Sequence, residues 1–211
     1  MRPRASAAGA RIGSPRLGAR RVGLLGGSFN PAHGGHLHIS LEALKRLDLD
    51  EVWWLVSPQN PLKSANGMAP LAERLATARD VARHPRIKVT DIEARLGTTF
   101  TADTLAALRR LFPKTRFVWL MGADNLLQIP RWERWENIFR LVPIAVFARP
   151  SYSLRSLSGL AARRFARRRV PPQRARKLAE TDPPAWVFLP IRLDARSATD
   201  IRSRRGAPAD H

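Results

Sequence analysis

Short apolar runs alternate with amphipathic helical patterns along this chain, and this alternation narrows the possible folds more than any other feature. The chain has 211 residues, which is enough for one full hydrophobic core. Six runs have the character of buried strands: VGLLGG (22–27), EVWWLVS (51–57), RIKVTDI (86–92), RFVWLMG (116–122), PIAVFARP (143–150) and AWVFLP (185–190). Helical patterns lie between them, as in HLHISLEALKRL, LAERLATARDVAR and TADTLAALRRLF. The alternation predicts an α/β fold, a Rossmann-like doubly wound parallel sheet in a single domain.

The loops that follow the first and fourth predicted strands are where a ligand is expected. Doubly wound sheets bind ligands outside the carboxyl ends of their strands, at the point where the strand order reverses. The first of these loops, GGSFNPAHGGHLHIS (26–40), contains three histidines and four glycines. The glycines at 26 and 27 suit a close backbone approach or a positive φ at the end of the strand.

Three kinds of site fit the histidines of this loop. A metal site built from His33, His36 and His38 lacks a neighbouring Asp, Glu or Cys, and the HExxH pattern is absent. Histidines that only cap or pack are a second interpretation. The third is phosphate binding, in which His33 and His36 direct ring N–H groups at an anion near the start of the helix. We favour the third, and we treat His38 as structural because it lies beside the apolar stripe of the helix.

Other phosphate-binding motifs are missing from the sequence. Neither GxGxxG nor the Walker pattern GxxxxGK[ST] occurs in this loop, so an ordinary dinucleotide fold or P-loop is not supported.

The net charge of +20 is concentrated in two segments. Residues 1–20 contain five arginines and no acid, and 151–179 contain eight arginines, one lysine and no acid. We expect 1–20 to be a disordered basic extension, although it also has the composition of an organellar transit peptide. We expect 151–184 to be a basic insert of helix and loop within a domain that spans 21–211. We expect these clusters to be solvated, and the alternative is a surface for nucleic acid.

Cysteine is absent, which excludes disulfides and thiolate metal sites. No apolar run approaches the roughly 20 residues that cross a bilayer, and the N-terminus lacks the apolar segment of a secretory signal. We therefore expect a cytoplasmic protein with no membrane partner.

Five segments in the same order resemble the nucleotidyltransferase superfamily with the (H/T)xGH signature, from about Arg21 to Arg205. They are GGSFNPAHGGHL, SPQNPLK, TTFTADTL, MGADNLLQIPRWERW and SATDIRSR. The GGSFNP form is similar to the nicotinate-nucleotide adenylyltransferase family in particular. The resemblance implies that ATP and nicotinate mononucleotide are the substrates, and that Mg²⁺ is bound through the ATP phosphates with no protein metal site.

The same resemblance implies roles for individual residues. His33, His36 and Arg202 would be catalytic. Contacts to ATP are expected from Gly26, Gly27, Ser28, Phe29, His33, His36, Ser197, Thr199, Ile201 and Arg202. Contacts to the mononucleotide are expected from Asn30, Lys63, Thr101, Asp124 and Trp132.

Several of these residues have a simpler alternative role. Asp124 and Thr101 are each also suited to cap a helix. Trp132 and Trp135 are three apart, so both are expected on one side of a short helix. By resemblance Trp132 stacks on the pyridine ring, while Trp135 is assigned to the core.

The chain departs from the family pattern at two positions. Phe100 stands where the family usually has Tyr, which removes a hydroxyl but keeps the ring. Ala198 lacks the hydroxyl that the family has in its C-terminal motif.

Three functions remain at this point. The first is adenylyl transfer from ATP to nicotinate mononucleotide, giving deamido-NAD and pyrophosphate. The alternatives are another small-molecule adenylyltransferase, such as the pantetheine-phosphate enzyme, and a basic nucleic-acid-binding protein. The sequence does not specify the oligomeric state or the degree of preference for nicotinate over nicotinamide mononucleotide.

Overall fold

The computed structural model describes residues 19–58, 67–148 and 152–191. Its seven strands form one sheet in the order β3-β2-β1-β4-β5-β7-β6, and every neighbouring pair is parallel. The strands are β1 (Arg20–Gly27), β2 (Glu51–Val56), β3 (Ile87–Thr90), β4 (Thr115–Gly122), β5 (Ile144–Phe147), β6 (Arg169–Val170) and β7 (Trp186–Leu189). The strand order reverses between β1 and β4, so the predicted α/β, doubly wound parallel sheet is confirmed.

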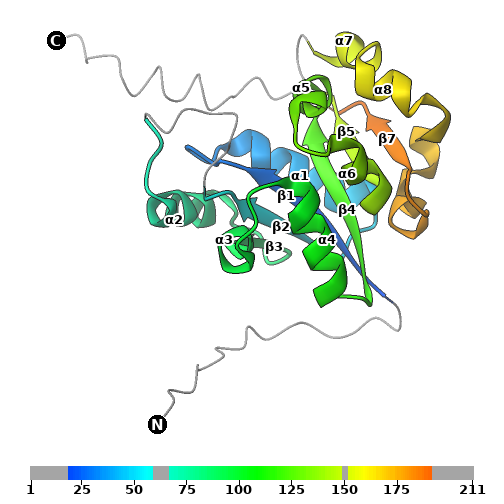
Figure 1. Cartoon of the computed structure of the whole chain (residues 1–211). Coiled ribbons are helices and arrows are strands. Elements are labelled where there is room, and N and C mark those ends of the chain that lie inside the picture. Colours follow the sequence, from blue (N-terminus) through cyan, green and yellow to red (C-terminus); the bar gives the residue numbers. More distant parts are fainter. Residues whose placement is uncertain (1–18, 59–66, 149–151, 192–211) are drawn as a thin grey trace.

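Helices cover both faces of this sheet (Figure 1). The α-helices are α1 (Gly34–Arg46), α2 (Leu71–Val81), α3 (Ile92–Leu96), α4 (Thr101–Leu111), α5 (Ala123–Gln128), α6 (Trp135–Leu141), α7 (Ser153–Leu157) and α8 (Leu160–Arg164). The 3₁₀ segments are η1 (Ile129–Arg131), η2 (Ala166–Arg168) and η3 (Pro172–Glu180).

Two adjacent tryptophans of β2 show how the layers form. Successive side chains of a strand point to opposite faces. Trp54 donates its indole N–H to Ser40 of α1, at 2.7 Å. Trp53 packs edge-on against Phe112, directly after α4, with ring centroids 5.5 Å apart. The helices α1 and α4 therefore lie on opposite faces.

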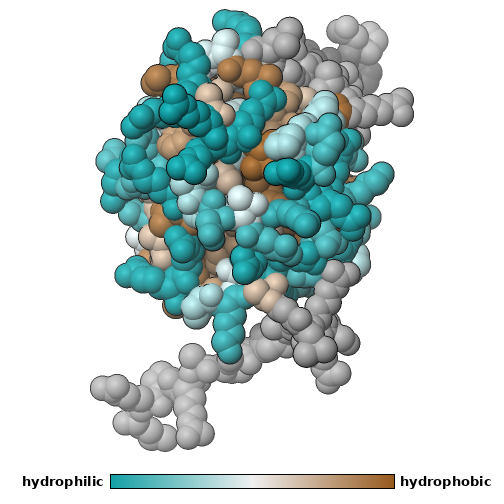
Figure 2. Space-filling model, turned by 90° about the vertical axis from the view of Figure 1, so that its right-hand side faces the viewer, coloured by the Kyte–Doolittle hydropathy of each residue, from teal (hydrophilic) through white to brown (hydrophobic). Residues whose placement is uncertain are grey.

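The basic insert is only partly as expected. It contains short helices and loops, but it also contains β6, a two-residue strand that pairs with β7 and that the sequence pattern did not predict. Two residues, one of them arginine, give no apolar run to detect. Figure 2 shows the side on which this insert lies, and hydrophilic side chains cover most of it. The exposed basic residues of the insert are Arg155, Arg163, Arg164, Arg167, Arg168, Arg169, Arg174, Arg176 and Lys177.

The start of the domain differs by one residue from the expected boundary. Arg20 already belongs to β1 and forms an ion pair with Glu51 of β2. Residues 1–18 lie outside the described part of the chain, so their predicted disorder stays a prediction.

Candidate active site

His33 and His36 form a reciprocal cap at the start of α1. His33 is the N-cap residue, and its Nδ1 accepts a hydrogen bond from the Gly35 N–H at 3.1 Å. The His33 N–H in turn donates to Nδ1 of His36 at 3.2 Å. The two ring centroids lie 3.9 Å apart. Capping by these histidines, which the sequence left as an alternative, is therefore present in the structure.

This cap fixes the tautomer of both rings. An imidazole nitrogen that accepts a hydrogen bond carries no proton, so the proton of each neutral ring is on Nε2. The two Nε2–H groups are donors held in place by the backbone at the carboxyl end of β1. Capping and anion binding are therefore compatible roles, because they use different ring nitrogens.

Phe29 gives the loop after β1 its shape. Its φ of 47° lies in the left-handed region, which is uncommon for an aromatic residue. Its side chain is 1% exposed and stacks on Trp54, with centroids 5.1 Å apart at 17°. Packing compensates for the strained backbone. The Phe29 ring thus belongs to the core, and a nucleotide contact by this residue would use its main chain.

Gly26 is required for packing. A Cβ at this position would overlap the ring of Trp119 in β4, so the close approach predicted from the sequence is confirmed here. Gly27 has neither a positive φ nor a tight contact at the Cβ position.

Trp119 also meets the half-buried Trp132 edge-on, with centroids 6.4 Å apart. The tryptophan predicted to stack on the pyridine ring therefore lies beside the carboxyl ends of β1 and β4.

Two side chains join the loop after β1 to the segment that precedes α2. The Asn30 amide donates to the Gly67 carbonyl at 2.9 Å and accepts from the Ala69 N–H at 3.2 Å. Arg74 of α2 is only 2% exposed, and it donates to the carbonyl of Ser28 and to three others nearby. Asn30 was predicted to contact the mononucleotide, and in the structure its amide binds the main chain.

A buried carboxyl group lies next to this junction. Glu93 of α3 is 6% exposed, and it forms hydrogen bonds with the side chains of Ser57 and Thr104. Burial raises the pKa of Glu93 from 4.5 to about 7, and the two hydrogen bonds partly oppose that rise. Thr104 also contacts the Thr98 hydroxyl at 2.8 Å. Glu93 therefore connects the end of β2 to the first turn of α4.

The structure excludes helix capping, the simpler role considered for Thr101 and Asp124. The N-cap of α4 is Phe100 and that of α5 is Gly122, and neither cap uses a side chain, so Thr101 and Asp124 are not caps. Thr101 is the first residue of α4 and Asp124 lies in the first turn of α5.

The expected placement of the two tryptophans on one helix was wrong. Trp132 directly follows η1 as its C-cap, whereas Trp135 begins α6. Arg134 separates them with a φ of 50°, and this left-handed residue interrupts the helix. Trp135 packs against Phe139 and Phe165, which is consistent with the core position assigned to it.

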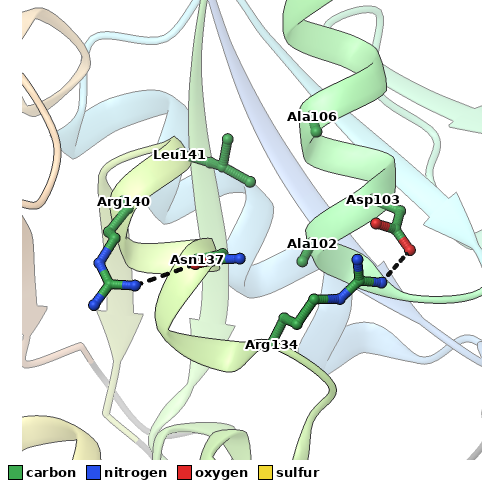
Figure 3. Close-up of a pocket in the computed structure, with 7 residues that line it drawn as sticks. All are labelled: Ala102, Asp103, Ala106, Arg134, Asn137, Arg140 and Leu141. Atoms are coloured by element: carbon green, nitrogen blue, oxygen red, sulfur yellow. Dashed lines mark hydrogen bonds and ion pairs between the residues drawn. The ribbon is translucent and has the colours of Figure 1, made fainter.

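A cavity of about 300 Å³ lies between α4 and α6 (Figure 3). It is lined by Ala102, Asp103, Ala106, Arg134, Asn137, Arg140 and Leu141, none of which is a predicted site residue. Across its edge Arg134 binds Asp103 at 2.6 Å and lies over the Phe100 ring at 5.9 Å. These contacts hold the segment that follows Trp132 against the start of α4, where Thr101 lies.

Five predicted site residues, Lys63, Ser197, Thr199, Ile201 and Arg202, lie outside the described residues. Within residues 19–58, 67–148 and 152–191, no three His, Asp or Glu side chains are grouped so that they could hold a metal ion. Imidazole N–H groups and main-chain N–H groups suit phosphate oxygens and cannot act as Mg²⁺ ligands. In the same part of the chain, no helix is both long and apolar enough to span a membrane.

Known proteins similar to this chain identify its family. The sequence profile of the family described as cytidylyltransferase-like matches residues 24–204. A probable nicotinate-nucleotide adenylyltransferase of Cereibacter sphaeroides is 62% identical over 182 residues, which cover 86% of this chain and 96% of that protein. The chain belongs to the nicotinate-nucleotide adenylyltransferase family. The corresponding protein of Parvibaculum lavamentivorans is 55% identical, over 88% of this chain and 92% of its own length.

A solved structure supports the fold of this adenylyltransferase family member. The nicotinic acid mononucleotide adenylyltransferase of Plasmodium falciparum, complexed with NaAD, superposes with a TM-score of 0.66. The match covers 87% of this chain and 83% of that one, at 17% identity.

Sequence reasoning missed two buried residues, Arg74 and Glu93. Arg74 does leave a signal, because it lies at helical spacing between Leu71, Leu75 and Ala78, in the buried stripe of α2. A charged residue within an apolar stripe is expected to have specific partners. Glu93 leaves no comparable signal, since α3 is too short for a clear period.

Proposed function

We propose that this chain transfers the adenylyl group of ATP to nicotinate mononucleotide, giving nicotinate adenine dinucleotide and pyrophosphate. Its relatives favour this reaction over the pantetheine-phosphate and nucleic-acid alternatives. The observation that supports the chemistry is the pair of Nε2–H donors of His33 and His36, which the cap orients at the carboxyl end of β1.

The reaction needs no covalent intermediate on the protein. A phosphate oxygen of the mononucleotide attacks the α-phosphorus of ATP, a new P–O bond forms, and the bond to the pyrophosphate oxygen breaks. The protein contributes positioning and stabilises the charge that develops on the phosphoryl oxygens. His33 and His36 would donate to those oxygens from the start of α1. Thr199 and Arg202 of the C-terminal motif would donate to the same oxygens.

Binding of the mononucleotide would use groups around the second loop and around α4. Lys63 would bind its phosphate, Thr101 would donate to the pyridine carboxylate, and Trp132 would stack on the ring. Asp124 lies at the carboxyl end of β4, where it would contact a ribose. We expect Mg²⁺ to be bound mainly through the phosphates of ATP. The cytoplasmic location stays a prediction.

Pyrophosphate release from ATP, measured in parallel with nicotinate and nicotinamide mononucleotides, tests the proposal. We expect release with both substrates and a higher kcat/KM for nicotinate mononucleotide. No release with either one would refute adenylyl transfer. A salt-dependent mobility shift of an unrelated RNA without ATP turnover would support the nucleic-acid alternative.

A further inference from the structure

The buried guanidinium of Arg74 binds only main-chain carbonyl oxygens. Its Nε donates to Ala69 at 2.9 Å, its Nη1 to Ser28 and Ser57 at 2.7 Å each, and its Nη2 to Pro58 at 2.8 Å. Among the described residues, no carboxylate forms an ion pair with it. A charge removed from water in this way is costly unless its donors are satisfied, and here all but one of the guanidinium N–H groups form a hydrogen bond.

The four carbonyls belong to three segments that meet at the carboxyl ends of β1 and β2. Ser28 is in the loop that leads to His33, Ser57 and Pro58 directly follow β2, and Ala69 precedes α2. The Ser57 N–H adds a main-chain hydrogen bond to the Gly27 carbonyl at 3.0 Å. A single side chain from α2 thus holds together the loop after β1, the end of β2 and the segment before α2.

The direction of these carbonyls matters for an anionic substrate. Carbonyl oxygens carry partial negative charge, so they would repel phosphate if they turned toward it. In a trans peptide the C=O and N–H groups point in opposite directions. Because the Ser28 carbonyl points at Arg74, the N–H of Phe29 points away from Arg74, in a backbone held at a left-handed φ.

We propose that Arg74 is a positioning residue for adenylyl transfer: its guanidinium orients the Ser28–Phe29 peptide and fixes the loop that carries His33 and His36. The inference rests on the proposed function. The forked geometry of arginine is what this role requires, because a lysine ammonium cannot reach four carbonyls in three segments.

The test compares full-length Arg74→Ala, Arg74→Lys and Arg21→Ala with the unchanged chain. Arg21 is the matched control, since it is also largely buried and paired with Asp48, but it lies at the opposite end of β1. The measurements are pyrophosphate release with ATP and nicotinate mononucleotide, thermal unfolding, and ATP affinity by calorimetry. Each assay is repeated in guanidinium chloride at a concentration well below the one that unfolds the protein. The controls contain sodium chloride or urea at the same concentration.

We expect Arg74→Ala to lose about 100-fold in kcat/KM, the typical effect of a small misplacement of catalytic groups. Guanidinium should raise the kcat/KM of Arg74→Ala by at least about tenfold, because it can occupy the space of the missing side chain, whereas sodium chloride and urea should not. Arg21→Ala should unfold at a lower temperature and stay within about threefold of the unchanged kcat/KM, because it is remote from the reacting groups.

A folded Arg74→Ala protein with kcat/KM within about threefold of the unchanged chain would overturn the inference. So would equal losses in Arg74→Ala and Arg21→Ala that guanidinium leaves unchanged. If Arg74→Ala does not fold, Arg74→Lys decides: full turnover refutes the role, and a loss of about tenfold or more in a folded protein supports it. If the unchanged chain itself releases no pyrophosphate, the proposed function fails. In that case ATP affinity decides for Arg74, with an unweakened Kd in the variant refuting its role.

Discussion

The main-chain N–H of His33 donates to Nδ1 of His36, and because of this bond the two nitrogens of the His36 ring have different roles. Nδ1 completes the cap of α1, and Nε2 is the protonated donor. Capping and donation can be separated by substitution. An Asn side chain places an acceptor near the position of Nδ1, whereas a Gln side chain places a donor near the position of Nε2.

His36→Asn should keep the cap and lose the donor, and His36→Gln should do the reverse. We expect His36→Asn to lower kcat by about 100-fold or more, the effect of removing one transition-state donor. We expect His36→Gln to keep more activity while losing about 1 kcal/mol of stability with the cap. Steady-state kinetics and thermal unfolding check both. Nitrogen-15 NMR of labelled histidine should show the Nε2–H tautomer for His33 and His36, and an Nδ1–H tautomer at either would contradict the assignment.

Glu93→Gln should change how stability depends on pH. Because burial raises the pKa of Glu93 to about 7, the native state retains a proton that the unfolded chain releases from about pH 4.5 upward. The free energy of unfolding therefore falls as the pH rises from about 4.5 to about 7, with no further loss from this group at higher pH. Glu93→Gln should be more stable than the unchanged chain by about 3 kcal/mol at pH 8 and similar to it at pH 4. Denaturant unfolding across this range measures the effect, with Glu73→Gln on the exposed side of α2 as the control. Parallel curves for Glu93→Gln and the unchanged chain would disprove the role of burial.

Selectivity between pyridine substrates should depend on the donors that face the ring. A carboxylate accepts every such donor, whereas an amide NH₂ leaves one unpaired at about 1–3 kcal/mol. We expect at least about tenfold higher kcat/KM for nicotinate than for nicotinamide mononucleotide. Thr101→Val should reduce this ratio, and Trp132→Ala should weaken both substrates through lost stacking. Trp135→Phe is the control for Trp132, because it affects only the core contacts with Phe139 and Phe165. Equal kcat/KM for the two mononucleotides would rule out a donor-lined ring site.

Gly26→Ala should destabilise the protein through one identifiable contact. The added methyl overlaps the benzo edge of Trp119, and overpacking of this kind costs about 1–3 kcal/mol. Trp119→Phe removes those ring atoms, so the double variant should recover part of the loss. A double-mutant cycle by denaturant unfolding gives the coupling. Additive effects of the two substitutions would mean that Trp119 is not what requires glycine at 26.

Removal of 1–18 should leave catalysis near that of the full chain, because the family likeness starts after this segment. Removal of 1–20 also deletes Arg20 and its partly exposed ion pair with Glu51, which is worth at most about 1 kcal/mol. Kinetics and thermal unfolding of the two truncations check this. A large fall in kcat/KM for the shorter truncation would place part of the extension in the site.

The sheet could be predicted because each long strand is a continuous apolar run, as buried parallel strands must be. The strand β6 could not, since two residues on the edge of the basic insert produce no run. For the candidate site, the sequence was sufficient to place His33 and His36 at the start of a helix that follows the first strand, and the structure has them there. The orientation of side chains and of the main chain in the site could not be predicted. Nothing in the sequence says that the Asn30 amide binds the main chain. Nor does it say that Arg134 adopts a left-handed φ and separates Trp132 from Trp135.

The central position of β1 has a consequence for synthesis on the ribosome. Its partner on one side, β2, follows soon after it, but its partner on the other side, β4, begins only at Thr115. A nascent chain that ends before Thr115 therefore leaves the β4-facing edge of β1 with unpaired main-chain N–H and C=O groups. Long-range parallel pairing of this kind is slow to form and vulnerable to aggregation. The loop that carries His33 and His36 is therefore synthesised long before β4 can pair with the strand that precedes it. Chaperones that shield exposed strands should matter most before β4 has been synthesised.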